Sequence, residues 1–160
     1  MIEYVNGNLL DVKEGIICQQ VNCRGVMGAG LAKQLKDKYP QIYTEYQEYI
    51  YNMMRYQHLT DYAKLKGCVN VVFLQKNLIC TNIFGQDAYG RDGIYTDYNA
   101  LKKGLTYIRD IVQPAYELPV YLPYGIGCGL AGGSWTVVKQ IIEDVFNNSD
   151  IKCTVVNKEY

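Results

Sequence analysis

Glycine is concentrated in two short stretches of this sequence. Of the 15 glycines, three lie at positions 25, 28 and 30, and five lie at positions 125, 127, 129, 132 and 133. Glycine lets backbone N–H groups approach a bound anion, and the N-terminus of a following helix adds about half a positive charge. Each stretch lies between a predicted strand and a predicted helix, so we expect the two to hold a diphosphate between them. The alternative is a pair of tight turns that bind nothing.

The second stretch also matches a dinucleotide-binding pattern. Residues 127–132, GCGLAG, have the G-x-G-x-x-G spacing between a strand and a helix. In a Rossmann fold this pattern occupies the first strand–helix turn, and most of the sheet follows it. Only one predicted strand follows residue 132 here. The sequence therefore argues against a nicotinamide-dependent oxidoreductase, although a glycine loop that holds pyrophosphate remains expected.

Strands and helices alternate along the chain. Apolar and β-branched runs predict strands at residues 2–5, 15–21, 68–74, 78–84, 119–122 and 151–156. Helical spacing of apolar residues predicts helices after Gly30, beyond Pro40, over 101–112 and over 135–145. For the last two helices we expect Thr96 and Ser134 as N-caps, and Pro114 as the end of the earlier one. A hairpin turn at residues 75–77 adds an antiparallel pair, so the pattern predicts an α/β fold with a mixed sheet of about six strands.

Length, composition and charge limit the class of protein. The 160 residues are 49% hydrophobic and 20% charged, which is typical of one folded domain, placed here at residues 1–160. Lys and Arg number 16, as do Asp and Glu, and this zero net charge argues against nucleic acid as a partner.

The chain also lacks the signs of export and of a metal site. No apolar run is long enough to span a membrane, and the first residues do not resemble a signal peptide. The six cysteines have no metal-binding spacing, and His58 is the only histidine. We therefore expect a cytoplasmic monomer with reduced thiols, no bound metal and no cofactor.

Three segments together resemble the macrodomain family. They are VNGNL at residues 5–9, VNCRGVMGAGLA at residues 21–32 and PYGIGCGL at residues 123–130. Within that family the chain is most similar to the branch of the terminal ADP-ribose protein glycohydrolase and the ADP-ribose 1''-phosphate phosphatase. The resemblance covers nearly the whole chain and implies a three-layer α/β/α fold whose cleft binds ADP-ribose.

The resemblance also implies roles for individual residues. Asn8 and Leu9 match the turn that meets adenine, where most relatives carry Asp in place of Asn8. Asn22 matches the residue that contacts the distal ribose, the segment 28–30 closes on that ribose, and the segment 127–130 matches the diphosphate loop. The ligand-binding residues implied in this way are Asn8, Leu9, Asn22, Gly28, Ala29, Gly30, Gly125, Ile126, Gly127, Cys128, Gly129, Leu130 and Asn157.

The catalytic residues of that branch are missing from this chain. The glycohydrolase has a Lys after the fourth strand and an Asp directly after GCGL, which we place at residues 80–83 and at Ala131; neither place carries such a residue. The phosphatase has a His where this chain has Gln19 or Gln20. Amide and alkyl side chains replace neither an amine nucleophile nor a proton-transfer group.

The polar loop at residues 84–95 offers other ionisable groups. Asp87 and Asp92 are the candidate bases and Arg91 is a candidate phosphate clamp, while the alternative is a solvated flap that only covers the ligand. We expect amides around Cys128 to lower the pKa of its thiol, in a structural role.

Two functions remain open on the sequence alone. One is a hydrolase that acts on ADP-ribose 1''-phosphate, an O-acyl ester or an ADP-ribosylated side chain or base. The other is a non-catalytic module that reads or sequesters an ADP-ribose-type nucleotide. Both functions require that ADP-ribose or a derivative binds.

Overall fold

Six strands form one sheet in the computed structural model, which describes residues 2–158. The order across the sheet is β1-β6-β5-β2-β4-β3. Only β3 runs antiparallel to its neighbour; the other pairs are parallel, so the sheet is mixed as predicted. The strands are β1 (Ile2–Asn6), β2 (Gly15–Asn22), β3 (Val69–Gln75), β4 (Leu78–Gln86), β5 (Val120–Pro123) and β6 (Cys153–Asn157).

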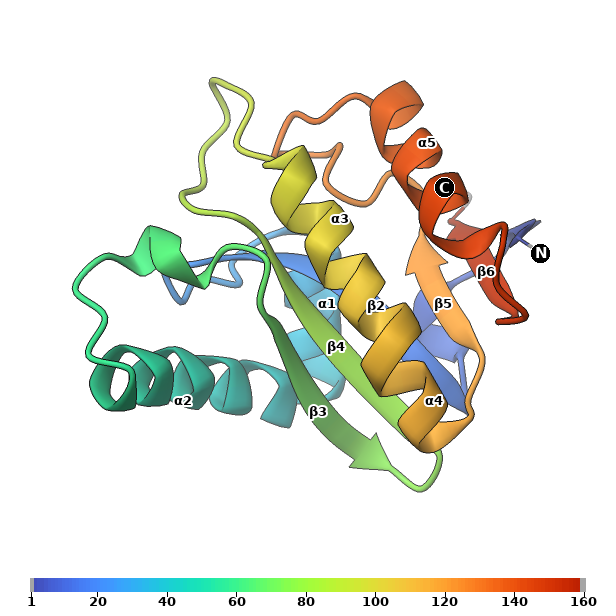
Figure 1. Cartoon of the computed structure of the whole chain (residues 1–160), viewed down its shortest axis with the longest axis horizontal. Helices are drawn as coiled ribbons and strands as arrows, with labels where there is room; N and C mark the ends of the chain where they lie inside the picture. Colours follow the sequence, from blue (N-terminus) through green and yellow to red (C-terminus); the bar gives the residue numbers. More distant parts are fainter. Residues whose placement is uncertain (1, 159–160) are drawn as a thin grey trace.

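Helices cover both faces of this sheet (Figure 1). The helices are α1 (Gly30–Lys38), α2 (Gln41–Tyr56), α3 (Tyr98–Tyr107), α4 (Gln113–Tyr116) and α5 (Trp135–Phe146). Apolar side chains of α1 and α2 pack against one face, and those of α3 and α5 pack against the other. All nine residues of β4 are buried, as expected for a strand covered on both faces. The predicted three-layer α/β/α arrangement is confirmed.

Two predicted helix boundaries are wrong. Asp97, not Thr96, caps α3, because its carboxylate accepts a hydrogen bond of 3.0 Å from the Ala100 N–H. Pro114 does not end the helix: a π-helical turn at Ile108–Val112 precedes it, and it lies in the first turn of α4. Proline is tolerated there because a first-turn N–H has no intrahelical partner.

A row of buried amides crosses three adjacent strands. Gln19 Nε2 donates to Asn82 Oδ1 at 2.8 Å, and Asn82 Nδ2 donates to Asn70 Oδ1 at 3.0 Å. The three side chains are 2%, 0% and 6% exposed. Because a one-residue slip of a strand would move its amide to the opposite face, the row stabilises a single register of β2, β4 and β3.

Three connections meet at one edge of the sheet. The first glycine loop (residues 23–29) follows β2, the second glycine loop (residues 124–133) follows β5, and a flap (residues 87–96) follows β4. The three strands are parallel neighbours, so their carboxyl ends lie side by side. In α/β sheets this edge is where ligands bind. Within residues 2–158, no helix has the length and apolar character needed to cross a membrane.

Gly104 tests how tightly α3 packs on the sheet. A Cβ atom there would lie 2.4 Å from Cγ2 of the buried Ile83. We expect Gly104→Ala to lower the free energy of unfolding by about 1–3 kcal/mol, even though alanine favours helix more than glycine does. Chemical denaturation measures this change.

Gly93→Ala is the matched control, because a Cβ at Gly93 meets nothing within 4 Å and the residue is not in the left-handed region. Equal stability of the two variants would contradict the close packing of α3 on β4.

Candidate ligand-binding cleft

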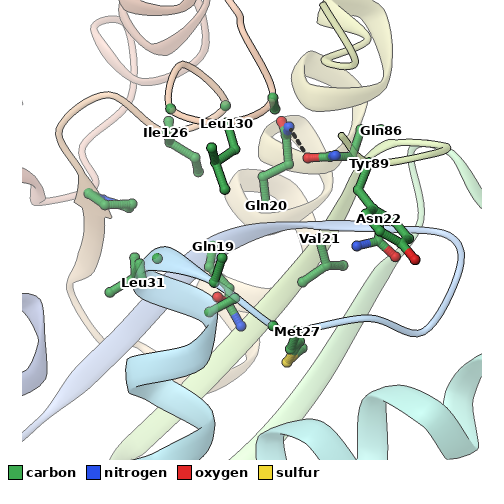
Figure 2. A pocket seen from close by; sticks show the side chains of 18 of the residues that line it. Gln19, Gln20, Val21, Asn22, Met27, Leu31, Gln86, Tyr89, Ile126 and Leu130 are labelled. Atoms are coloured by element: carbon green, nitrogen blue, oxygen red, sulfur yellow. Dashed lines mark hydrogen bonds between the residues drawn. The ribbon is translucent and has the colours of Figure 1, made fainter. Parts of the chain in front are cut away.

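A cavity of about 550 Å³ opens at the carboxyl edge of the sheet (Figure 2). Its walls are the two glycine loops, the first turn of α1 and the part of the flap at Tyr89–Arg91. The structure brings most of the residues implied by the resemblance into this lining: Asn22, Gly28, Ala29, Gly30, Gly125, Ile126, Gly127, Gly129 and Leu130. Loops far apart in the sequence thus form one binding-sized cleft.

Asn22 shapes the first glycine loop. Its Oδ1 accepts hydrogen bonds from the N–H groups of Arg24 at 2.9 Å and Val26 at 3.4 Å, and its Nδ2 donates to the Val26 carbonyl at 2.8 Å. The Tyr46 hydroxyl, from α2, lies 2.6 Å from the Asn22 carbonyl and 3.1 Å from the Gly25 nitrogen, and so ties the loop to the helix below. Figure 2 shows the Asn22 amide nitrogen on the cleft side, where its second hydrogen is available to a ligand.

The N-terminus of α1 points its free amides at the same cleft. Its N-cap residue, Ala29, provides no side-chain hydrogen bond to the first turn. The first N–H groups of an α-helix have no intrahelical acceptor, and they carry part of the positive end of the helix dipole. Since Gly30, Leu31 and Ala32 line the cleft, this end of α1 favours a bound anion.

The second glycine loop presents further amides from the opposite side. Backbone hydrogen bonds use the N–H groups of Tyr124, Ile126, Cys128, Gly132 and Gly133. None of the hydrogen bonds found within residues 2–158 uses the N–H of Gly129 or Leu130, and both residues line the cleft. Unpaired main-chain donors at the start of α1 and in the second loop therefore line the same cleft from opposite sides.

A relay of side chains holds the second loop in place. Gln20 Nε2 donates to Gln86 Oε1 and to Thr96 Oγ1, both at 2.9 Å, and Thr96 Oγ1 donates to the Gly127 carbonyl at 2.6 Å. Gly127 has a φ of +75°, and a Cβ there would lie 2.9 Å from Gln20 Oε1. The relay thus requires glycine at 127 and connects the end of β2 with the flap and the second loop.

Two buried acceptor oxygens beside the cleft have no partner. Among the described residues, the buried side-chain atoms without a hydrogen bond are Gln19 Oε1 and Gln20 Oε1. Both residues line the cleft with other atoms, while Gln20 Oε1 is packed against the backbone of Gly85 and Gly127. An unpaired buried acceptor costs free energy, so these two amides reduce the stability of the fold at the end of β2.

Neither of the two candidate bases reaches the cleft. Both oxygens of Asp87 accept hydrogen bonds of 3.0 Å from the Arg24 guanidinium, in a bidentate ion pair. Asp92 accepts a hydrogen bond from the Tyr95 hydroxyl, which lowers the pKa of this carboxyl group. Neither residue belongs to the lining. Of the described residues that line the cleft, none carries a carboxylate, and Arg91 is the one charged side chain.

The place assigned to the family's lysine is corrected by the structure. Residues 80–83 lie in the middle of β4 and are fully buried. The strand runs on to Gln86, so Gln86 is its last residue and the one that lines the cleft. The sequence did not indicate Gln86, because the apolar pattern of β4 ends at Phe84.

Cys128 differs from expectation in one respect. Burial raises the pKa of its thiol, whereas the surrounding amides were expected to lower it. The side chain packs against the core formed with α3 and α5, and Sγ lies 3.4 Å from the Ile126 carbonyl. The thiol therefore faces away from the amides of the loop, and Cys128 is not part of the cleft lining.

Three further residues implied by the resemblance also lie outside the lining, at the ends of β1 and β6. Asn8 accepts a hydrogen bond of 3.0 Å from the Leu10 N–H, and Leu9 is buried. The Asn157 carbonyl accepts from the Gly7 N–H at 2.8 Å. Tyr124 lines the cleft, and its N–H donates to the carbonyl of Val156, the residue before Asn157. The contact of Asn8, Leu9 and Asn157 with adenine stays a prediction.

Solved structures with the same fold include macrodomains. A macrodomain protein from Streptomyces coelicolor is 26% identical over 98% of each chain, with a TM-score of 0.77. A Bacteroides thetaiotaomicron protein of unknown function is 25% identical over 98% of each chain, with a TM-score of 0.84. A Thermosipho africanus DarTG structure in complex with ADP-ribose shares the fold at 19% identity and a TM-score of 0.72, over 94% of this chain and 40% of that one. The fold of this chain is the macrodomain fold.

Sequence comparison gives a shorter match. No protein-family model matches the chain. A DNA ADP-ribosyl glycohydrolase from Mycobacterium tuberculosis is 44% identical over 48 residues, and the same match is found in Mycobacterium bovis. The match spans 30% of this chain and 14% of the mycobacterial protein.

Thr96→Val tests the relay that holds the second loop. The substitution keeps the shape of the buried side chain but removes both hydrogen bonds of the hydroxyl group. We expect the free energy of unfolding to fall by about 1–3 kcal/mol, because the Gly127 carbonyl loses its partner. We also expect faster amide hydrogen exchange in the second glycine loop.

Thr106→Val is the matched control, since the Thr106 hydroxyl bonds to the Lys102 carbonyl on the exposed surface of α3. Stability and exchange that change equally in both variants would show that Thr96 does not hold the loop.

Proposed function

We propose that this chain binds ADP-ribose, or an ADP-ribosyl group on a larger molecule, in the cleft between the two glycine loops. The observation that carries the proposal is the pair of facing amide sets, at the start of α1 and at Gly129 and Leu130. Main-chain donors of this kind recognise phosphate, and two sets on opposite walls match two linked phosphates.

The charge of the cleft supports the same ligand. Among the described lining residues none carries a carboxylate that would oppose an anion. A volume of about 550 Å³ is within the range of nucleotide-sized pockets. The DarTG structure with the same fold, solved with ADP-ribose, adds support from outside the chain.

Binding is tested by calorimetry with ADP-ribose and AMP. We expect micromolar affinity for ADP-ribose, about −7 to −9 kcal/mol, and at least about tenfold weaker binding of AMP, which cannot bridge two loops. Equal affinities for the two nucleotides would contradict a diphosphate site between the loops.

Gly129→Val tests the second loop directly. A Cβ at Gly129 meets nothing within 4 Å and the φ of this residue is not positive, so the protein tolerates the side chain. The new side chain lies in the cleft lining and blocks access to the amides, so we expect ADP-ribose binding to fall below detection at an unchanged melting temperature. Gly93→Val, outside the lining, should bind as the wild type does. Normal binding by a folded Gly129→Val variant would show that the second loop is a turn that does not contact the ligand.

Hydrolysis of an ADP-ribosyl linkage is the second candidate function. The 48-residue match to DNA ADP-ribosyl glycohydrolases favours it. The cleft can stabilise developing negative charge through its amides, but the described lining contains no carboxylate, lysine or histidine to move a proton. Turnover would therefore rely on water activated by the ligand's own phosphates. A module that binds without turnover is the alternative.

The absence of proton-transfer groups from the described lining predicts slow removal of ADP-ribose from glutamate side chains. One positioned acid or base contributes about 10²–10⁴-fold to a rate, and this cleft lacks that contribution. ADP-ribose 1''-phosphate should be affected less, because water is the nucleophile there.

Both substrates are assayed by product release over the same enzyme concentrations, with Gly129→Val as the control for activity outside the cleft. Rapid deglutamylation that disappears in this control would falsify the assignment of an acid–base-free cleft.

A further inference from the structure

We propose that Arg91 makes this cleft selective for ligands that carry a third phosphate, beyond the diphosphate of ADP-ribose, on the side of the cleft that the flap covers. The proposal rests on the proposed function and narrows its ligand class.

The charged side chains of the flap divide into two groups. Asp87 is turned outward into a bidentate ion pair with Arg24, and Asp92 is bound by Tyr95. Both acids are therefore occupied, and neither lines the cleft. Arg91, between them in sequence, does line the cleft and is exposed, and among the interactions of residues 2–158 it has no hydrogen bond or ion pair. A guanidinium is thus available to a ligand with no neighbouring carboxylate neutralising it.

Hydrogen bonds at both ends fix the flap over the cleft. At its start, the Cys23 N–H donates to the Asp87 carbonyl at 2.9 Å, next to the first glycine loop. At its end, the Tyr95 N–H donates to the Ala131 carbonyl at 2.7 Å, on the second loop. The Tyr89 side chain reaches back from the flap to Asn22 (Figure 2). The flap therefore forms an arch between the loops, and Arg91 lies on this arch two residues after Tyr89.

The glycine loops and Arg91 offer different chemistry. Under the proposed function, main-chain amides at the start of α1 and in the second glycine loop hold the diphosphate, so ADP-ribose itself does not require the guanidinium. Arg presents parallel N–H groups that match two oxygens of one phosphate, and such charge-assisted pairs are stronger than neutral hydrogen bonds. A third phosphate has two chemical sources: a monoester on the distal ribose, as in ADP-ribose 1''-phosphate, or the phosphodiester backbone of a nucleic acid that carries the ADP-ribosyl group.

The experiment measures dissociation constants of four ligands for the wild type, Arg91→Ala and Arg91→Lys. The ligands are ADP-ribose, ADP-ribose 1''-phosphate, an ADP-ribosylated nucleoside without a phosphate of its own, and the same nucleoside within a short oligonucleotide. Lys76→Ala is the matched control, because it removes one exposed cation at the other end of β4, in the β3–β4 turn. Melting temperatures show that every variant is folded.

We expect Arg91→Ala to weaken binding of phosphate-bearing ligands by about 10- to 100-fold, and binding of ADP-ribose and the ADP-ribosylated nucleoside by less than about threefold. Arg91→Lys should recover part of the loss, because it restores the charge without the paired N–H groups. Loss for the 1''-phosphate alone identifies the monoester as the source, and loss for the oligonucleotide alone identifies the phosphodiester.

Two results overturn the inference. An equal loss for all four ligands would place Arg91 on the diphosphate, and no loss for any ligand would leave it a solvated side chain of the flap. The proposed function fails in a different way, when the wild type binds none of the four ligands.

Discussion

The carboxyl end of β2 is held by side-chain amides on both of its faces, and the cleft takes its shape from this arrangement. On the side of α1 and α2, Gln19 is the first member of the buried amide row that ends at Asn70. On the side of α3, Gln20 is bound to Gln86 and Thr96. Consecutive residues of a strand point to opposite faces, so two neighbouring glutamines fix one strand end within two layers of the fold.

This arrangement explains how glycine-rich loops keep a defined shape. Glycine has more conformational freedom than other residues, so a loop rich in it loses more entropy when it is ordered. The first loop is held by Asn22 and Tyr46, and the second by Thr96 and by its own turns. Because these contacts order the loops in advance, a ligand meets amides that already point into the cleft, and less of its binding energy is spent on ordering them.

The chemistry of the cleft follows from what these polar residues are. Amides hold a backbone in place and form hydrogen bonds, but they do not transfer protons near neutral pH. The polar side chains that β2 and β4 bring to the cleft are Gln19, Gln20, Asn22 and Gln86, and the two acids of the flap are bound to other partners. The described lining therefore offers amides to an anion but no carboxylate, lysine or histidine for proton transfer.

The sequence by itself determined the strands, the mixed α/β sheet and the two glycine loops that the structure brings to one cleft, because period-two and helical spacing and glycine clusters are local signals. It did not indicate that Asp97, and not Thr96, caps α3, or that the Thr96 hydroxyl donates to the carbonyl of Gly127, a residue 31 positions away. Nor did it indicate that Asp87 and Asp92 are occupied elsewhere while Arg91 is available, or that β4 reaches the cleft through Gln86. Those outcomes depend on which side chains of distant segments meet at the sheet edge, and such pairings are decided only when β2, β4 and β5 lie side by side in the folded chain.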